Sequence, residues 1–339
     1  MKNIWIDLTN SPHVLFFKPI IEELKNRNYN VFITCRDYAQ TKDLLDNYKL
    51  KYKLIGHHAG SNIFKKFYWL LKRSFLLYKY MKNKNINLAL SHNSVDICVV
   101  SRFLKIPIID IFDYEYASFH HINFRFANKI MFPKYINKKK LKKYGGKQSK
   151  CIPYEGLKEH IYLYNYNFDN NILDKINIKK DNKTKLVLLR PPATMALYHQ
   201  GIKNYLYSDL IYYLSSKKNV KVIFMPRTNQ QKVEIEQKNL NNFVILNKTV
   251  DGPSLIKKVD LVISGGGTMN REAVALNKPV YSILALKLGD VDKYLIKKNY
   301  LKLLTNVKDL NLNNLNFKKN NLKGSNPKDM VTIFEKYMK

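Results

Sequence analysis

The sequence is poor in cysteine, and its three cysteines lie far apart. Cys35, Cys98 and Cys151 form no CxxC or CxxxxC pair, so the pattern excludes a disulfide framework and a zinc site built from thiolates. No uninterrupted apolar run approaches the roughly 20 residues that span a bilayer. Asp7 lies in the N-terminal segment MKNIWIDLTN, where a signal peptide would need apolar residues. We therefore expect a reduced, cytoplasmic protein that is neither secreted nor transmembrane.

Acidic residues are also few. The chain has 26 Asp and Glu against 59 Lys and Arg, which gives a formal net charge of +33. Such a charge favours binding to polyanions of any kind, including nucleic acid, acidic lipid and nucleotides. The basic residues are mostly lysines spread over the chain, and no zinc-finger spacing, basic-region heptad repeat or aromatic RNA-binding signature is present. We therefore expect no specific nucleic-acid partner.

Short apolar runs alternate with helical patterns along the chain, which is typical of βαβ units and a parallel sheet. In the first half we expect strands at NIWIDL, NVFITC, YKLI, INLALSH, IPIIDIF and KIMFP. A charged segment at 137–150 separates them from a second series at LVLLR, VKVIFMP, FVILN, DLVISGG and PVYSI. The 339 residues thus predict an α/β protein with two Rossmann-like domains. These are an N-terminal domain at 1–150 and a C-terminal domain at 151–339, whose last helix is a candidate to return to the first domain.

The most specific segment is SGGGTMNRE, which starts at Ser264 between a predicted strand and a predicted helix. Three glycines at the carboxyl end of a strand let the backbone approach an anion, and a helix that starts near Thr268 directs unpaired N–H groups toward it. Glu272, farther along that helix, can bind two ribose hydroxyls. The pattern is neither GxGxxG nor GxxxxGK[ST], so a tight turn that only requires glycine is the alternative to a nucleotide site. The predicted binding residues here are Ser264, Gly265, Gly266, Gly267, Thr268, Asn270 and Glu272.

A second candidate is the first strand-to-helix turn, TNSPHVLFF, because ligands bind at the carboxyl edge of the central strands of such sheets. Asn10 and Ser11 are predicted to contact substrate there. His13 is the predicted general base or acceptor-orienting residue, since an unperturbed imidazole titrates near neutral pH. The structural alternative is that Ser11 caps the helix, and this role is compatible with a functional His13.

Further candidates follow other predicted strands. Arg190 lies in the RPP turn, His199 follows it, and Arg227 lies in MPRTNQ. An arginine at a strand end can bind a diphosphate through two hydrogen bonds, and the alternative is a surface arginine without a ligand. In the first half, Asp113 and Glu115 are candidate catalytic carboxylates, with helix capping as the alternative.

Residues 61–85, SNIFKKFYWLLKRSFLLYKYMKNKN, predict a long helix that interleaves aromatic and basic side chains. Helices of this type lie on anionic membrane surfaces. The alternative is a helix that packs on the core and exposes a solvated basic face. Peripheral membrane contact through 61–85, at the inner face of the membrane, is therefore a hypothesis.

Four segments together resemble one family. WIDLTNSPHVLFFKPIIEEL, YEGLKEHIYL, the RPPA turn and SGGGTMNREAVALNKPVYSI resemble the bacterial and archaeal family called domain of unknown function 354. The resemblance covers essentially the whole chain. It implies the GT-B fold, which consists of two Rossmann-like domains with a cleft between them, and it implies no particular reaction.

Two better-known GT-B groups are similar in single segments. SPHVLFFKPIIEEL is similar to the GGHVFPGLAVAHHL-type turn of the lipid-linked N-acetylglucosamine transferase of peptidoglycan synthesis, with His13 at the matching histidine. EAVALNKPV is similar to EAPSLGKPV of UDP-N-acetylglucosamine 2-epimerases, which implies that Glu272 binds the uridine ribose and that the glycine turn before it holds the diphosphate.

The chain departs from the epimerases at two acidic positions. Their HGDT turn corresponds to His92-Asn93-Ser94 here, and their VEAGLR glutamate falls near Phe112 or Asp113 but out of register. Because elimination and re-addition of the nucleotide need carboxylates that move protons, these departures count against an epimerase.

The sequence therefore predicts a GT-B glycosyltransferase-like enzyme. Its donor would be a nucleotide-diphospho-sugar, UDP-linked in view of the resemblance, and its acceptor a glycan or a lipid-linked glycan in cell-surface polysaccharide synthesis. We expect no metal and no cofactor, because a helix N-terminus and an arginine can stabilise the leaving diphosphate. The alternatives are a UDP-sugar 2-epimerase, hydrolysing or not, and a non-catalytic basic protein that binds nucleic acid or anionic membrane.

Overall fold

The structure is a computed structural model that describes residues 1–38, 41–57, 63–181, 183–192, 205–284 and 287–338. The chain folds into two compact units. Unit 1 comprises 1–164, 289–291 and 323–339, and unit 2 comprises 165–288 and 292–322. The chain thus leaves unit 1 at Tyr164, whereas the sequence pattern predicted a division at residue 150, and the C-terminal helix lies in unit 1.

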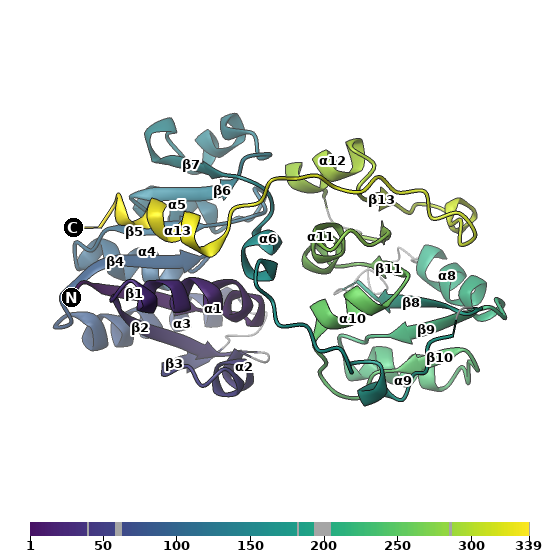
Figure 1. Ribbon diagram of the computed structural model, residues 1–339. Helices are drawn as coiled ribbons and strands as arrows, with labels where there is room; N and C mark the ends of the chain where they lie inside the picture. Colours follow the sequence, from purple (N-terminus) through teal and green to yellow (C-terminus); the bar gives the residue numbers. More distant parts are fainter. Residues whose placement is uncertain (39–40, 58–62, 182, 193–204, 285–286, 339) are drawn as a thin grey trace. The chain divides into compact units, whose positions relative to one another are not determined.

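Unit 1 is built around a parallel sheet with the strand order β3-β2-β1-β4-β5-β6-β7 (Figure 1). The chain order reverses beside β1, so the carboxyl ends of β1 and β4 meet where ligands bind in such sheets. The strands are β1 (Asn3–Leu8), β2 (Asn30–Asp37), β3 (Lys53–His57), β4 (Ile86–His92), β5 (Ile108–Ile111), β6 (Lys129–Pro133) and β7 (Cys151–Tyr154).

Helices cover both faces of this sheet. Helix α1 contacts α2, α6 and α13, while α4 contacts α3 and α5. In the part of the chain that the structure describes, no helix is both long and apolar enough to cross a membrane. The helices are α1 (Ser11–Asn26), α2 (Thr41–Asn47), α3 (Ile63–Met81), α4 (Val95–Phe103), α5 (His120–Phe126), α6 (Lys158–Leu163) and α13 (Pro327–Glu335), with short 3-10 helices η1 (Lys138–Tyr144) and η2 (Gln148–Lys150).

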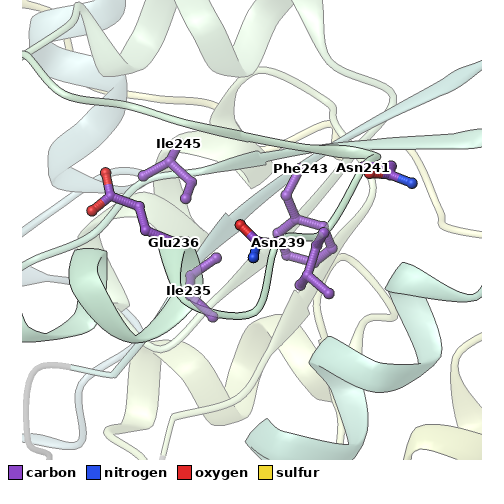
Figure 2. A pocket seen from close by; sticks show the side chains of 7 residues that line it. Ile235, Glu236, Asn239, Asn241, Phe243 and Ile245 are labelled. Atoms are coloured by element: carbon purple, nitrogen blue, oxygen red, sulfur yellow. The ribbon is translucent and has the colours of Figure 1, made fainter.

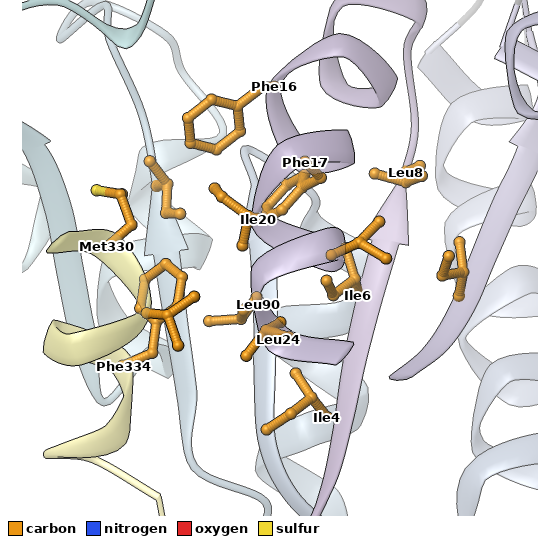
Figure 3. Close-up of a cluster of buried hydrophobic side chains, with 14 of the residues drawn as sticks. Ile4, Ile6, Leu8, Phe16, Phe17, Ile20, Leu24, Leu90, Met330 and Phe334 are labelled. Carbon is orange, nitrogen blue, oxygen red and sulfur yellow. The ribbon is translucent and has the colours of Figure 1, made fainter. Parts of the chain in front are cut away.

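The core of unit 1 lies between β1, α1 and α13 (Figure 3). Strand β1 is buried almost throughout because helices pack on both faces of a parallel sheet. Helix α1 presents Phe17, Ile20 and Leu24 at helical spacing to this core. Met330 and Phe334 of α13 enter the same cluster, so the last helix returns to unit 1 because it buries its apolar face there.

Unit 2 contains a second parallel sheet, with the order β10-β9-β8-β11-β12-β13. Counted from the first strand of each sheet, β1 and β8, the six strands of unit 2 follow the same order as the first six strands of unit 1. This confirms the prediction of an α/β fold with two Rossmann-like sheets. The elements are η3 (Asp174–Ile176), β8 (Lys185–Arg190), α8 (Tyr205–Ser215), β9 (Val220–Phe224), α9 (Asn229–Glu236), β10 (Phe243–Ile245), α10 (Gly252–Lys258), β11 (Leu261–Ser264), α11 (Gly267–Ala275), β12 (Val280–Ser282), β13 (Lys302–Leu303) and η4 (Val307–Asp309). Helix α12 (Asp290–Lys297) also belongs here from Asp292 onward, while its first two residues are assigned to unit 1.

Candidate functional site

The first candidate cluster lies at the carboxyl edge of the unit 1 sheet, around His13. The imidazole lies in the first turn of α1, with Nδ1 3.3 Å from Oγ1 of Thr9. Asn10 caps the helix, because its Oδ1 accepts a hydrogen bond from the Ser11 N–H at 2.9 Å. The prediction that Ser11 caps α1 is therefore wrong: Ser11 is already the first helical residue.

Three side chains from other elements lie beside His13. The ring centroids of His13 and His92 are 4.7 Å apart, and His92 Nε2 lies 3.8 Å from Oδ1 of Asp113. Lys158, the first residue of α6, donates a hydrogen bond from Nζ to the other Asp113 oxygen at 2.6 Å. Lys158 and Asp113 are only 4% and 8% exposed, so this ion pair is largely withdrawn from water. The structure thus brings the predicted His13 and Asp113 into one cluster with His92 and Lys158.

The environment of His13 keeps its imidazole neutral at neutral pH. Burial lowers the pKa of His13 well below its ordinary value, and the neighbouring His92 and Lys158 lower it further, while Asp113 opposes them. A neutral imidazole has a free ring nitrogen lone pair, so it can accept a proton from a hydroxyl group.

Asp110, in β5, is a buried acid near this cluster. It was not among the candidates predicted from the sequence. Its Oδ1 accepts hydrogen bonds from Ser91 Oγ at 2.5 Å and from the Asn93 N–H at 3.0 Å, and its Oδ2 accepts one from Asn123 Nδ2 at 3.0 Å. Burial raises the pKa of Asp110 to about 7, although these hydrogen bonds oppose the shift. Asp110 therefore holds the turn that follows His92. An acid inside the apolar run IPIIDIF was the signal that could have identified it.

Glu115 belongs to a different cluster within unit 1. It is fully buried, and its Oε1 accepts a hydrogen bond from the Asp290 N–H at 2.9 Å and lies 3.6 Å from Lys140 Nζ. Lys140 also forms an ion pair with Asp290. Burial raises the pKa of Glu115. The predicted catalytic Glu115 therefore contacts the 289–291 segment, and its contacts give it a structural part in holding that segment in unit 1.

The second candidate cluster lies at the carboxyl edge of the unit 2 sheet, in the turn between β11 and α11. The Gly265 N–H donates to the Arg190 carbonyl at 2.9 Å, and the Gly266 N–H donates to Ser264 Oγ at 3.0 Å. A Cβ on Gly265 would lie 2.5 Å from the Cα of Pro192, so glycine is required for this close approach. Gly266 is the N-cap of α11 and offers no side chain to its first N–H groups.

Two arginines lie beside this turn. Arg227 donates from Nε to the Pro191 carbonyl at 2.8 Å, and its Nη2 occupies the space that a Cβ on Gly266 would need. Arg190 donates from Nη1 to Met225 Sδ at 3.2 Å, and its buried Nε has no hydrogen-bond partner among the described residues. Burial, and then the charge of Arg190, lowers the pKa of Arg227 to about 10, so Arg227 remains a cation at neutral pH. The structure brings together the predicted residues Arg190, Arg227, Ser264, Gly265, Gly266, Gly267 and Thr268 at this edge.

The other predicted residues of unit 2 differ in their placement. Glu272 is buried on α11, and its charge raises the pKa of Arg190 against the larger effect of burial. Asn270 donates from Nδ2 to Ser282 Oγ at 2.9 Å, so its side chain ties α11 to β12. His199 lies outside the described residues.

A surface hollow of about 460 Å³ lies beside β10, one of the two edge strands of the unit 2 sheet (Figure 2). Ile235 and Glu236 of α9 and Phe243 and Ile245 of β10 line it, and none of the predicted site residues does. The hollow is therefore not part of either cluster. Within the ranges given above, no three His, Cys, Asp or Glu side chains are arranged to hold a metal ion.

Known proteins match this chain over nearly its whole length. Residues 2–336 match the family described as "Protein of unknown function (DUF354)". The uncharacterized protein MJ0665 of Methanocaldococcus jannaschii is 30% identical over 326 residues, which cover 94% of this chain and 92% of the relative.

Solved structures of similar fold include a UDP-GlcNAc 2-epimerase and MurG. The UDP-GlcNAc 2-epimerase of Methanocaldococcus jannaschii, in complex with UDP-GlcNAc and UDP, has a TM-score of 0.75 at 14% identity over 99% of each chain. MurG of Acinetobacter baumannii has a TM-score of 0.55 at 15% identity, over 100% of this chain and 91% of that chain. Both likenesses agree with the two parallel sheets described above. The chain belongs to the DUF354 family and has a GT-B-like fold.

Proposed function

We propose that this protein is an enzyme that takes a UDP-sugar as donor and transfers the sugar to an acceptor hydroxyl. The observation that carries the proposal is the convergence of Arg190, Arg227 and the N-terminus of α11 on the glycine turn of unit 2. The solved epimerase of similar fold holds UDP-GlcNAc and UDP, which supports a uridine nucleotide as the ligand of this fold.

In this proposal unit 2 binds the nucleotide. The first N–H groups of α11 and the two guanidinium groups bind the diphosphate, and the buried Arg190 Nε, which has no protein partner among the described residues, donates to one of its oxygens. Glu272 accepts hydrogen bonds from the ribose hydroxyls. When the bond between the anomeric carbon and the diphosphate oxygen breaks, negative charge grows on UDP, and the same cations stabilise it.

Unit 1 supplies the groups that act on the acceptor. His13 accepts the proton of the attacking hydroxyl on a ring nitrogen of its neutral imidazole as that oxygen bonds to the anomeric carbon. Lys158 and Asp113 fix the polar surroundings of the imidazole through their buried ion pair. The acceptor is a glycan or a lipid-linked glycan of the cell surface.

A UDP-sugar 2-epimerase is the second candidate, and one observation favours it. Asp113 is a buried carboxylate beside His92 and Lys158, so unit 1 does hold a carboxylate near other proton-transfer groups, although it is not at the positions the epimerase motifs require. An epimerase would convert the sugar without an acceptor, whereas a transferase would leave the UDP-sugar largely unchanged until an acceptor is added.

Proton NMR of the protein with UDP-, GDP-, CMP- and dTDP-sugars tests both candidates. We expect line broadening with UDP-sugars, and an Arg227→Ala variant should weaken UDP binding by about 10- to 100-fold, since a hydrogen bond to a charged group contributes about 1.5–3 kcal/mol. Lys238→Ala removes one exposed positive charge just after α9 and is the matched control, with unchanged UDP binding. Equal UDP affinity in the parent and Arg227→Ala would contradict the proposed site.

A further inference from the structure

Helix α3 carries the largest group of exposed apolar side chains among the described residues. Phe67, Leu71, Phe75 and Tyr78 are 63%, 56%, 65% and 40% exposed, and Tyr68 and Leu76 add to them. The first three are four residues apart and Tyr78 follows three later, so the four side chains form one stripe along the helix. Single exposed apolar residues are ordinary on protein surfaces, but a contiguous stripe of aromatic rings indicates an interaction surface.

Lysines line one side of this stripe. Lys65, Lys72 and Lys79 are exposed and seven residues apart, so they follow a parallel line along the same helix. Lys72 Nζ lies 4.7 Å from the ring centroid of Trp69. The sequence of α3 contains no acidic residue. A partner that complements this surface therefore offers an apolar region to the stripe and negatively charged groups to the lysines beside it.

The opposite side of α3 is fixed to unit 1 by buried charges. Arg73 is 3% exposed and bonds to Asp7 through Nη2 at 2.7 Å and to Asp96 through Nη1 at 2.8 Å. Leu77 and Met81 are buried on the same side. These contacts decide which side of the amphipathic helix faces the core, and they leave the aromatic stripe and the lysines in solvent.

From these features we infer that α3 docks unit 1 on a membrane surface that contains anionic phospholipid. The aromatic stripe enters the boundary between headgroups and acyl chains, and the lysines bind the phosphates. A second copy of this chain does not fit, because the chain carries a net charge of +33 and would meet the same basic border.

The placement of α3 connects this surface with the proposed reaction. Helix α3 follows β3, so it begins at the carboxyl edge of the unit 1 sheet, the edge that carries His13. A membrane contact there would bring a lipid-linked acceptor to the edge of the unit 1 sheet that carries His13. The inference rests on the proposed function for the identity of that acceptor, whereas vesicle binding without nucleotide tests the surface alone.

Flotation of the full chain with vesicles is the experiment, comparing phosphatidylcholine alone with phosphatidylcholine mixed with phosphatidylglycerol. We expect binding only to the mixed vesicles, with a loss of at least about tenfold in Phe67→Ser/Leu71→Ser/Phe75→Ser. Lys65→Gln/Lys79→Gln should lose about fivefold per lysine, and added salt should weaken binding by the parent. Tyr212→Ser on α8 of unit 2 removes an equally exposed ring, since Tyr212 is 77% exposed, and should bind as the parent does.

Several results would overturn the inference: no binding by the parent, equal binding by the parent and the triple variant, or a parent dimer that the triple variant dissociates. Melting curves of the variants should match that of the parent, because the exchanged side chains are exposed. If the α3 variants lose vesicle binding and keep UDP binding, the membrane-docking inference is supported independently of the nucleotide site. If the parent binds vesicles but not UDP, only the proposed function is contradicted.

Discussion

The two units share a strand order but differ in what lies at the carboxyl edge of each sheet. In unit 1 this edge carries titratable side chains: the partly buried His13, and the buried His92 and Asp113–Lys158 pair. In unit 2 it carries backbone N–H groups of a glycine turn and the cations Arg190 and Arg227. The same scaffold therefore presents different groups at the two edges, because the loops and not the strands set which side chains and backbone groups lie there.

The largest expected effect is on the free energy of unfolding, and it comes from removing one partner of the buried Lys158–Asp113 ion pair in unit 1. Lys158→Ala leaves the Asp113 carboxylate buried without its cation, so the free energy of unfolding of unit 1 should fall by about 3–5 kcal/mol. The matched change in unit 2 is Lys180→Ala, which removes one partner of the exposed pair with Asp260 and should cost less than about 1 kcal/mol. Denaturant unfolding measures both. Equal losses would show that burial of the Lys158–Asp113 pair does not raise the cost of removing its cation.

A smaller effect concerns Asp110 and pH. The pKa of Asp110 is about 7 in the folded protein and ordinary in the unfolded chain. Between about pH 4 and 7 the folded state therefore binds a proton that the unfolded state has lost, so this group makes the free energy of unfolding fall as pH rises. Asp110→Asn lacks this contribution. The difference between the free energies of unfolding of parent and variant should therefore change by about 2–4 kcal/mol between about pH 4 and 7. Parallel stability curves of the two proteins against pH would contradict it.

The smallest expected effect separates two neighbouring glycines of unit 2. Gly265→Ala meets the backbone of Pro192, which must move, so the variant should lose about 1–3 kcal/mol of stability. Gly266→Ala meets only the end of the Arg227 side chain, so its stability should stay within about 0.5 kcal/mol of the parent. UDP affinity should nevertheless fall about tenfold in Gly266→Ala, because Arg227 is pushed away from the turn. Calorimetry with UDP checks this, and unchanged affinity would separate Arg227 from the anion site.

Local patterns predicted the architecture well. The alternation of apolar runs and helical periods identified β1, β4, β8 and β11, since strand burial on both faces leaves a continuous apolar run in the sequence. Glycine turns and strand-end cations are also visible within a few residues of sequence, so the segment from Ser264 to Thr268 and the two arginines could be selected as candidates, and their role in binding stays a prediction.

The partners of the buried charges were not predictable in this way. Lys158 and Asp113 are 45 residues apart in the chain, and Arg73 and Asp7 are 66 apart. A lysine at the start of a short helix is indistinguishable from a solvated one in the sequence, because burial depends on the elements that pack over it. Likewise, Glu115 was selected as a catalytic acid from its position after a strand, whereas its hydrogen bond from the Asp290 N–H joins it to a segment 175 residues away.

The sequence by itself determined two parallel α/β sheets, the glycine turn with its arginines, and a basic aromatic helix at 63–81. The physical reason is that backbone periodicity, turn chemistry and net charge are properties of neighbouring residues. The tertiary structure alone decided that His13 meets His92, Asp113 and Lys158, that α13 closes the core of unit 1, and which side of α3 remains in solvent. These outcomes depend on desolvation and on close packing between distant segments, which no local pattern contains.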